Sequence, residues 1–381
     1  MTINNEHKKL NAPNLRFPEF QGEWEKTKIG DIAIVVGGGT PDTNTSQYWN
    51  GKIQWFTPSE IGRNKYVYNS VRTISEEGLN KSSAKLLPIG TILLSSRATV
   101  GECSINKKEC TTNQGFQSLI PKENISNEFV YYLIQTKRKD LIRKSCGSTF
   151  LEISANEVRK IVVSIPTIKE QDKIAKLLSL LDERIATQNK IIDKLQSLIK
   201  GISSRIFTSI QGIEYRMGDI VTITNGNSNV QDAVTQSKDG LYPFFDRSED
   251  IKYLPTFLFD KEAIIYPGEG TEFMPRYFKG KFALHQRCYA IFDFNEIINA
   301  RFLYFYLKTR NSYFVKNAVG STVPSLRLDT FQKLKVIIPS KKIQHSVSLC
   351  LSSMEQKCNV EKKILHKLLK QKQYLLRQMF I

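Results

Sequence analysis

The sequence lacks the features that mark several large classes of protein. It has six cysteines but no C-x-x-C pair, and only four histidines could complete a metal site. No apolar run is long enough to span a membrane, and the N-terminal segment has no apolar stretch of signal-peptide length. These absences argue against a disulfide framework, a bound metal and a membrane protein. The sequence therefore predicts a cytoplasmic protein with free thiols.

Catalytic motifs are missing as well. There is no N-P-P-aromatic or D-P-P-aromatic methyltransferase loop and no G-x-x-x-x-G-K-[ST] phosphate loop, and Pro41-Asp42 is not followed by a nuclease-like acidic-x-Lys pair. The run GGGT at Gly37 follows a strand-like segment and leaves a choice between a phosphate loop and a turn, of which the turn is favoured. We expect the chain to be non-catalytic.

What the sequence does have is length and positive charge. Its 381 residues carry a formal net charge of +18, and 40% of them are hydrophobic, which is enough for two domains with their own cores. This excess of Lys and Arg favours a polyanionic partner, with nucleic acid ahead of an anionic membrane surface.

An internal repeat organises the chain. Residues 127–207 match residues 300–380 without a gap, and roughly 19 of the 81 pairs are identical. The matched segments include FVYYLIQTK at Phe129 with FLYFYLKTR at Phe302, CGSTF at Cys146 with VGSTV at Val319, and, at the start of each half, IGDIAIVVGGG with MGDIVTITNGN. The chain thus consists of two copies of one unit whose ends are kept and whose middle has diverged.

Each copy combines a strand-rich middle with a long helix. Short apolar and β-branched segments broken by Gly, Pro, Asn and Asp predict the strands. Apolar residues at alternating spacings of four and three then predict helices too long to be buried singly. We expect an α+β fold with two tandem strand-rich domains, each followed by a long helix, and an antiparallel coiled coil with pseudo-twofold symmetry. The predicted seam comprises Ile174, Leu178, Leu181, Ile185, Gln188, Ile192 and Leu195 with Val347, Leu351, Met354, Cys358, Glu361, Leu365 and Leu368.

The antiparallel arrangement brings Gln188 and Glu361 close together, where a polar pair either fixes the helix register or is exposed to water. The predicted segments are an N-terminal arm (1–22), a first domain (23–167), a central spacer helix (168–207), a second domain (208–340) and a distal spacer helix (341–381).

These features together resemble the DNA specificity subunit of type I restriction-modification systems. The matching stretches are NLRFPEFQGEWEKTKIGDI at Asn14, IPTIKEQDKIAKLLSLLDERI at Ile165 and LLRQMF at Leu375, and the resemblance covers essentially the whole chain. It implies that the two domains are target recognition domains, each reading half of a split sequence in double-stranded DNA. It also implies docking of two modification subunits that use S-adenosylmethionine for adenine methylation, and restriction subunits that use ATP and Mg in the full complex. At the second helix start Ile343 replaces Glu170, which is a departure from the pattern.

Side chains that read DNA must reach base edges or phosphates from loops. Candidates follow strand-like segments or surround the kept G-S-T sequence, and for each the alternative is a solvated side chain or a local turn hydrogen bond. They are Ser96, Arg97, Asn113, Gln114, Lys144, Ser148 and Thr149 in the first domain, and Arg276, His285, Gln286, Arg287, Lys316, Ser321 and Thr322 in the second.

Two further alternatives concern the helices. The distal helix has about nine Lys or Arg against two acidic residues, so it either lies along DNA or docks a modification subunit, and docking is favoured. For the whole chain, the rival to a specificity subunit is a nucleic-acid-binding scaffold that self-associates through its coiled coil. Divergent middles between constant ends favour the specificity subunit.

The repeat yields a test of modularity. Replacing residues 24–160 with the equivalent region of a relative should change one half-site and leave the other half-site and the gap unchanged, because each domain is expected to read independently. Sequencing of methylated sites in a host carrying the exchanged chain measures this. A change in both half-sites would show that the domains are not separate readers.

Overall fold

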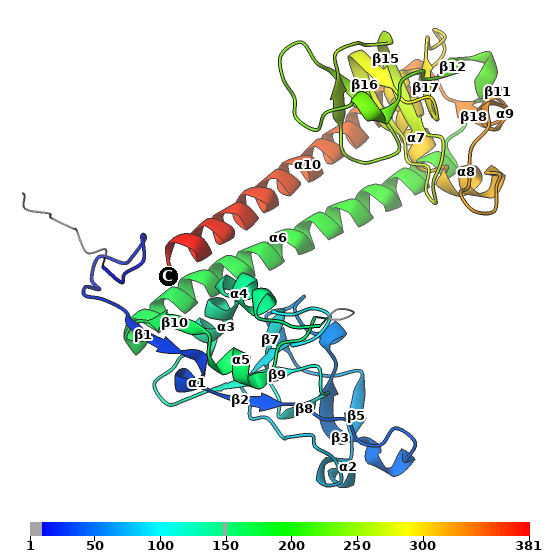
Figure 1. Cartoon of the computed structure of the whole chain (residues 1–381). Coiled ribbons are helices and arrows are strands. Elements are labelled where there is room, and N and C mark those ends of the chain that lie inside the picture. The colour runs from blue at the N-terminus through cyan, green and yellow to red at the C-terminus, as the bar shows by residue number, and fades with distance from the viewer. Residues whose placement is uncertain (1–9, 148–150) are drawn as a thin grey trace, which may run out of the picture. The chain divides into compact units, whose positions relative to one another are not determined.

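The computed structural model describes residues 10–147 and 151–381 and has an α+β fold. Two strand-rich domains are each followed by a long continuous helix, α6 (Ile168–Ser209) and α10 (Lys341–Gln378) (Figure 1). The described residues divide into unit 1, which runs to Thr187 and includes Leu365–Ile381, and unit 2, which is Gln188–Ile364. Each unit therefore contains one domain and part of both long helices. No helix in the described ranges is long and apolar enough to cross a membrane.

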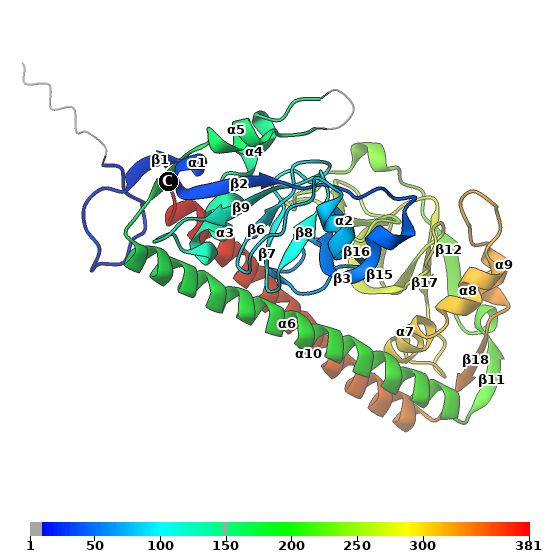
Figure 2. The same cartoon turned by 90° about the horizontal axis from the view of Figure 1, so that it is seen from below.

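The described residues of unit 1 form three small sheets, with strand orders β2-β9-β6-β7-β4, β5-β3-β8 and β1-β10. Figure 2 shows β2, β9, β6 and β7 side by side in that order. Its strands are β1 (Glu25–Lys28), β2 (Ala33–Gly37), β3 (Trp49–Phe56), β4 (Tyr66–Val67), β5 (Arg72–Ile74), β6 (Ile92–Leu94), β7 (Cys103–Asn106), β8 (Cys110–Thr112), β9 (Gln117–Pro121) and β10 (Val162–Ile165). Its shorter helices are α1 (Ile29–Ile32), α2 (Glu76–Asn80), α3 (Asn127–Thr136), α4 (Arg138–Arg143) and α5 (Ala155–Arg159).

Unit 2 contains two sheets, with strand orders β12-β17-β15-β16-β13-β14 and β11-β18. Its strands are β11 (Ile213–Arg216), β12 (Thr222–Asn225), β13 (Tyr242–Phe245), β14 (Lys252–Leu254), β15 (Phe259–Pro267), β16 (Arg276–Leu284), β17 (Cys288–Phe292) and β18 (Lys335–Ile338). Its shorter helices are α7 (Ala300–Lys308), α8 (Asn311–Asn317) and α9 (Leu328–Gln332).

The two domains share a strand order that their divergent middle sequences do not reveal. In unit 1 the order β2-β9-β6-β7-β4 is antiparallel throughout except for the parallel pair β4·β7. In unit 2 the order β12-β17-β15-β16-β13 has the same directions, and β13·β16 is the parallel pair. One five-stranded framework therefore underlies both domains.

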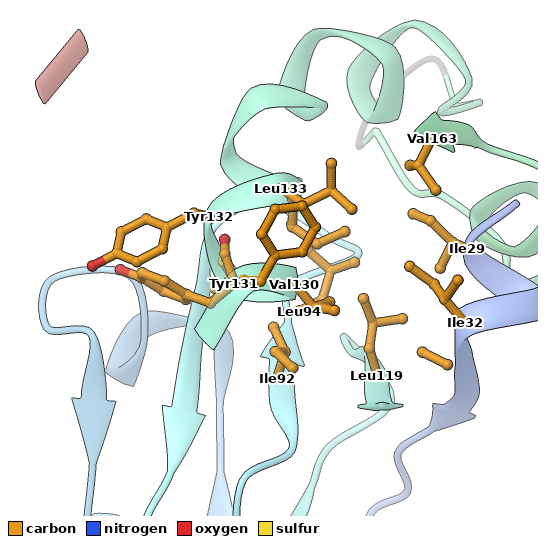
Figure 3. Close-up of a cluster of buried hydrophobic side chains, with 14 of the residues drawn as sticks. Ile29, Ile32, Ile92, Leu94, Leu119, Val130, Tyr131, Tyr132, Leu133 and Val163 are labelled. Carbon is orange, nitrogen blue, oxygen red and sulfur yellow. The ribbon is translucent and has the colours of Figure 1, made fainter. Parts of the chain in front are cut away.

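A helix with a buried run of apolar and aromatic residues anchors each sheet. In unit 1, α3 presents Val130 and Leu133 to Ile92 and Leu94 of β6 and to Leu119 of β9 (Figure 3). Consecutive residues of α3 are buried on every side, which is the pattern of a helix enclosed by a core. In unit 2, α7 takes the same role and is just as buried. The six cysteines are free thiols, and four of them are buried.

The long helices pack against each other in antiparallel directions. In unit 1, Ile174 near the start of α6 shares a buried cluster with Phe380 just after α10, and Phe380 stacks on Phe129 with ring centroids 5.2 Å apart. In unit 2, Phe207 near the end of α6 packs edge-on against Phe302 at 5.5 Å. The repeat offset matches Phe207 with Phe380 and Phe129 with Phe302, so each domain is covered by the last aromatic residue of the other copy's helix.

All fourteen predicted seam residues are buried or half-buried. The polar pair within the seam is in direct contact, because the side-chain amide of Gln188 donates to the Glu361 carboxylate at 2.6 Å and to its carbonyl at 3.1 Å. Lys357 forms an ion pair with the other carboxylate oxygen at 2.7 Å. The hydrogen bonds from Lys357 and Gln188 lower the pKa of Glu361, so the carboxylate stays charged and paired.

One buried glutamine fixes the start of each long helix. In unit 1, Gln171 accepts a hydrogen bond from the Ser126 amide at 3.0 Å and donates to the Pro166 carbonyl at 2.9 Å. In unit 2, Gln344 accepts from the Asn299 amide at 2.7 Å and donates at 2.9 Å to the carbonyls of Pro339 and Ile297. These two glutamines are identical partners in the repeat. Each glutamine thereby links the proline between the last strand of its domain and the long helix to the residue just before the anchoring helix, α3 or α7.

The difference between Glu170 and Ile343 at the first turn of the two long helices has a structural reason. Glu170 is buried and accepts two hydrogen bonds from Arg16 of the N-terminal arm, both at 2.8 Å, and one from the indole of Trp24 at 3.3 Å. Its counterpart Ile343 is 45% exposed. The acid is therefore needed only where the N-terminal arm binds.

Replacing Gln171 with Ala should lower the free energy of unfolding by about 1–3 kcal/mol, because a buried amide and a buried carbonyl lose their partner. Gln344→Ala should do the same for unit 2. Gln196→Ala, at an exposed position of α6, is the matched control and should change stability by less than about 0.5 kcal/mol. Urea unfolding measures the loss, and faster hydrogen exchange at the Ser126 amide would locate it in Gln171→Ala. Equal effects for Gln171→Ala and Gln196→Ala would contradict this role.

Candidate nucleic-acid interface

The loops that carry most of the candidates meet at one end of the sheet in unit 1. Because β9 is antiparallel to both β2 and β6, its start lies beside the ends of those strands. The backbone amide of Gly39 donates to the carbonyl of Thr112, and that of Ser96 donates to the carbonyl of Gly115, both at 2.8 Å. The amide of Ile153 donates to the Ser96 carbonyl at 3.0 Å, which adds the end of the loop that begins with the kept sequence CGSTF.

Unit 2 builds the same arrangement from β12, β15 and β17. The amide of Gly226 donates to Cys288 at 3.2 Å, and that of Leu326 donates to Gly268 at 2.7 Å. Leu326 matches Ile153 at the repeat offset, so the kept loop is tied to the same strand end in both domains. We call these loops the loop face of each domain. The loop face comprises residues 37–40, 95–97, 113–116, 146–147 and 151–152 in unit 1, and residues 225–228, 267–269, 285–287 and 319–325 in unit 2.

Glycines set the close approach of these loops. A Cβ atom on Gly38 would lie 2.0 Å from the carbonyl oxygen of Asn113, and one on Gly226 would lie 2.0 Å from that of Leu284. A Cβ atom on Gly39 would lie 2.3 Å from the Ser83 hydroxyl. The glycines of GGGT and NGN therefore pack against neighbouring loops, and this packing accounts for them without a bound phosphate.

On the loop face of unit 1, Arg97 and Gln114 are exposed. Arg97 forms an ion pair with Glu152 through its Nε atom at 2.8 Å. The Gln114 amide oxygen accepts a hydrogen bond from the Thr40 hydroxyl at 2.5 Å. Asn113 is half-buried, and its side-chain oxygen accepts from the amide two residues ahead, at 2.9 Å, so it shapes the turn.

The remaining candidates of unit 1 differ in accessibility. Ser96 is buried, and its hydroxyl has no hydrogen-bond partner among the described residues, so its side chain is not on the surface. Lys144 is half-buried directly after α4, with its Nζ atom 3.7 Å from Glu157. Ser148 and Thr149 lie outside the described residues.

On the loop face of unit 2, His285, Gln286 and Arg287 form the turn between β16 and β17. Arg287 binds both carboxylate oxygens of Glu269 through Nη1, at 2.9 and 3.0 Å. Gln286 is exposed, and His285 is half-buried.

The other candidates of unit 2 lie nearby or are already engaged. Ser321 and Thr322 are exposed in the kept loop, and Lys316 is exposed on α8. Arg276 is half-buried at the start of β16, where its guanidinium donates to the carbonyls of Asp246 and Ser248. Its position indicates a structural role within the domain.

A cavity of about 280 Å³ opens beside this turn of unit 2. Its lining residues are Val230, Asp246, Arg247, Glu269, His285, Gln286, Arg287 and Cys288. Burial disfavours the charge of Asp246, but an ion pair with Lys252 at 2.6 Å and the Ser248 hydroxyl outweigh it and lower the pKa of the acid. Asp246 is therefore held as a charged carboxylate, paired with Lys252, next to the cationic and polar side chains of the turn.

His285 supplies a neutral hydrogen-bonding group to this cavity. Burial and the neighbouring Arg287 lower the pKa of the imidazole from 6.5, although Asp246 and Glu269 oppose this shift. At neutral pH the ring is therefore uncharged. Because Nδ1 accepts the Arg287 amide at 3.2 Å, the proton is on Nε2, which is the available donor.

Sequence reasoning missed the two glutamates that bind the arginines. A carboxylate is an unexpected neighbour for DNA phosphates, so Glu152 and Glu269 gave no signal of their own. The two glycines that flank Glu269 were the only available indication of a constrained loop. Within the described ranges, no three His, Cys, Asp or Glu side chains are arranged to hold a metal ion.

A duplicated basic chain with one variable loop face per domain is built as a protein with two binding sites. Comparison with known proteins gives the family. The model of the type I restriction modification DNA specificity domain matches residues 21–197 and 213–370. The chain is 30% identical to the MjaIX specificity subunit of Methanocaldococcus jannaschii, over 90% of this chain and 89% of that protein. It is 32% identical to the EcoR124I/EcoR124II specificity subunit of Escherichia coli, over 44% and 43% of the two chains.

The fold agrees with these relatives. The crystal structure of a type I restriction-modification S subunit from M. genitalium matches with a TM-score of 0.66 and 18% identity, over 97% of this chain and 99% of that chain. The chain therefore belongs to the type I restriction-modification specificity subunits, which confirms the resemblance seen in the sequence. It is a non-catalytic subunit that determines DNA target recognition.

The glycine contacts can be tested directly. Gly38→Ala and Gly226→Ala should each lower stability by roughly 1–3 kcal/mol and weaken DNA binding by the complex, because the new Cβ atom must displace the adjoining turn. Gly201→Ala, inside α6 with no atom within 4 Å of its Cβ position, should instead raise stability by up to about 1 kcal/mol. Thermal unfolding and DNA binding provide the measurements. Unchanged binding in both loop variants would show that the approach of the loops is unimportant.

Proposed function

We propose that the loop face of each domain binds one half of a split sequence in double-stranded DNA. The observation that supports this most directly is that corresponding loops, with the kept loop tied to the same strand end by the matching amides of Ile153 and Leu326, carry different side chains in the two domains. Asn113 and Gln114 correspond to His285 and Gln286 at the same turn. A constant framework with different side chains at one place is what two readers of different base sequences require.

The exposed side chains suit the chemistry of DNA recognition. Arg97 and Arg287 can donate two hydrogen bonds to guanine, and Gln114 and Gln286 can pair with adenine. The Nε2 donor of His285 can bind a base nitrogen or oxygen acceptor.

Phosphate contacts would come from Lys144, Ser148 and Thr149 in the first domain, and from Lys316, Ser321 and Thr322 in the second. Ser96, Asn113 and Arg276 would act inside the domains, by holding the loops in place.

In this proposal the recognition domains are residues 23–167 and 208–340, after an N-terminal arm at 1–22. The spacer helices at 168–207 and 341–381 provide the docking surfaces for two modification subunits. Apolar side chains exposed on the helices support docking. These are Ile168, Leu180, Leu369 and Tyr374 in unit 1, and Ile191, Leu198, Ile343, Leu349 and Val360 in unit 2.

Cofactors would reside on the partners in this assembly. The modification subunits would bind S-adenosylmethionine, and restriction subunits in the full complex would bind ATP and Mg. A solved structure from work on complex assembly of the type I R-M system matches this fold with a TM-score of 0.57 and 14% identity. It supports the same architecture for this chain.

Reconstitution tests this function. The purified chain should neither methylate nor cut DNA, whereas one chain with two modification subunits and S-adenosylmethionine should methylate adenine at a single split sequence. Methylation-sensitive sequencing and the mass of the complex provide the readouts, and modification subunits alone are the control. Methyl transfer by the chain alone would overturn the proposal. So would a self-associated chain that ignores the modification subunits, which is the behaviour of a scaffold.

A further inference from the structure

Both loop faces hold an arginine that is paired with a glutamate. Arg97 binds Glu152 at 2.8 Å in unit 1, and Arg287 binds Glu269 at 2.9 and 3.0 Å in unit 2. In both pairs the arginine side chain is well exposed, at 46% and 62%. The same kind of pair is thus present on two faces whose sequences have diverged.

The two pairs are formed at the same β-bridge, between the end of a strand and the kept loop, but the arginine and the glutamate come from different segments in the two domains. Arg97 forms a β-bridge with Glu152, and Glu269 forms one with Ser325. Glu152 matches Ser325 at the repeat offset, so Arg97 and Glu269 occupy equivalent places at the end of a strand. The position that holds the arginine in one domain holds the glutamate in the other, and each domain has supplied the opposite charge from a different loop.

Stability does not explain these pairs. Exposed ion pairs contribute only about 0–1 kcal/mol to folding. On a face that approaches DNA, a carboxylate also repels phosphates and reduces the number of counterions that binding releases. A carboxylate at this place in both domains therefore needs a role in binding.

We propose that Glu152 and Glu269 are positioning residues that give the arginines their specificity, an inference that rests on the proposed DNA-binding function of the loop faces. Each glutamate holds its arginine in one orientation and neutralises its charge, so that a phosphate gains little by approaching it. Among the described residues the glutamates contact Nε of Arg97 and Nη1 of Arg287, which leaves both Nη groups of Arg97 and the Nε and Nη2 groups of Arg287 as further donors. Those groups can still donate to the edge of a guanine.

The test compares Glu152→Gln and Glu269→Gln with the unaltered chain, each in complex with modification subunits. Two duplexes are used, one selected from a random library by the unaltered complex and one with its sequence scrambled. Dissociation constants are measured over a range of salt concentrations. Each variant should bind the scrambled duplex several-fold more tightly, with a salt dependence steeper by about 0.9 as expected for one additional phosphate contact. Discrimination between the duplexes should fall roughly tenfold, which is within the range for one bidentate base contact.

Controls separate positioning from general electrostatics. Asp293→Asn removes a carboxylate that pairs with Lys261 at 2.6 Å just after β17, at the opposite end of that strand from Arg287. It should strengthen binding to both duplexes by the same factor and leave discrimination unchanged. Glu269→Asp keeps the charge and should retain most of the discrimination. Thermal unfolding checks that every variant folds.

The outcomes are distinguishable. If Glu152→Gln and Glu269→Gln change the affinity for both duplexes equally, as Asp293→Asn should, the glutamates contribute only charge and the inference is wrong. If the unaltered complex does not prefer any duplex, the proposed function itself fails. If discrimination falls in Glu→Gln variants that fold normally and is kept in Glu269→Asp, the positioning role stands.

Discussion

The structure depends on the burial of one aromatic residue at the end of each long helix. Phe380 packs on Phe129 and Trp24 in unit 1, and Phe207 packs on Phe302 and Tyr306 in unit 2. A helix of about 40 residues exposes more apolar surface than it can cover alone, and each of these ends is covered by the domain of the other copy. Neither copy can therefore complete its core without the other, which explains why the sequence is kept at these ends and is free to change between them.

Buried polar residues fix the register of the helices within this apolar core. Gln171 and Gln344 each satisfy a backbone amide and a carbonyl where a strand passes into a helix, so the groups that these two glutamines contact are paired although they are buried. Within the seam, the side-chain amide of Gln188 donates to both the carboxylate and the carbonyl of Glu361. Such contacts contribute little net free energy, but a shift of helix register by one residue would leave several buried groups unpaired.

The sequence predicted the helices well and the sheets poorly, for physical reasons. A heptad pattern reports both the length of a helix and the face that it buries, so the contact of Gln188 with Glu361 followed from the repeat alone. A short apolar run reports only that a strand is buried and says nothing of its partner. The five-stranded order common to both domains was hidden for that reason. Ser96 resembled a loop residue, yet its backbone continues the pairing of β6 with β9, and this buries its side chain. Glu152 and Glu269 become visible only through the arginines that they bind.

The two domains can diverge on their loop faces because the contacts that shape those faces involve backbone atoms. Gly38 and Gly226 approach the carbonyl oxygens of Asn113 and Leu284, and the kept loops are tied to the strand ends by amides and carbonyls. Every residue type has the carbonyl, and every type except proline has the amide N–H, so most substitutions at a turn leave these backbone contacts unchanged. The exposed side chains of Gln114, Gln286 and Arg287 are consequently free to vary without loss of the framework. Since the glycines cannot vary in the same way, the demands of folding and those of base recognition fall on different residues.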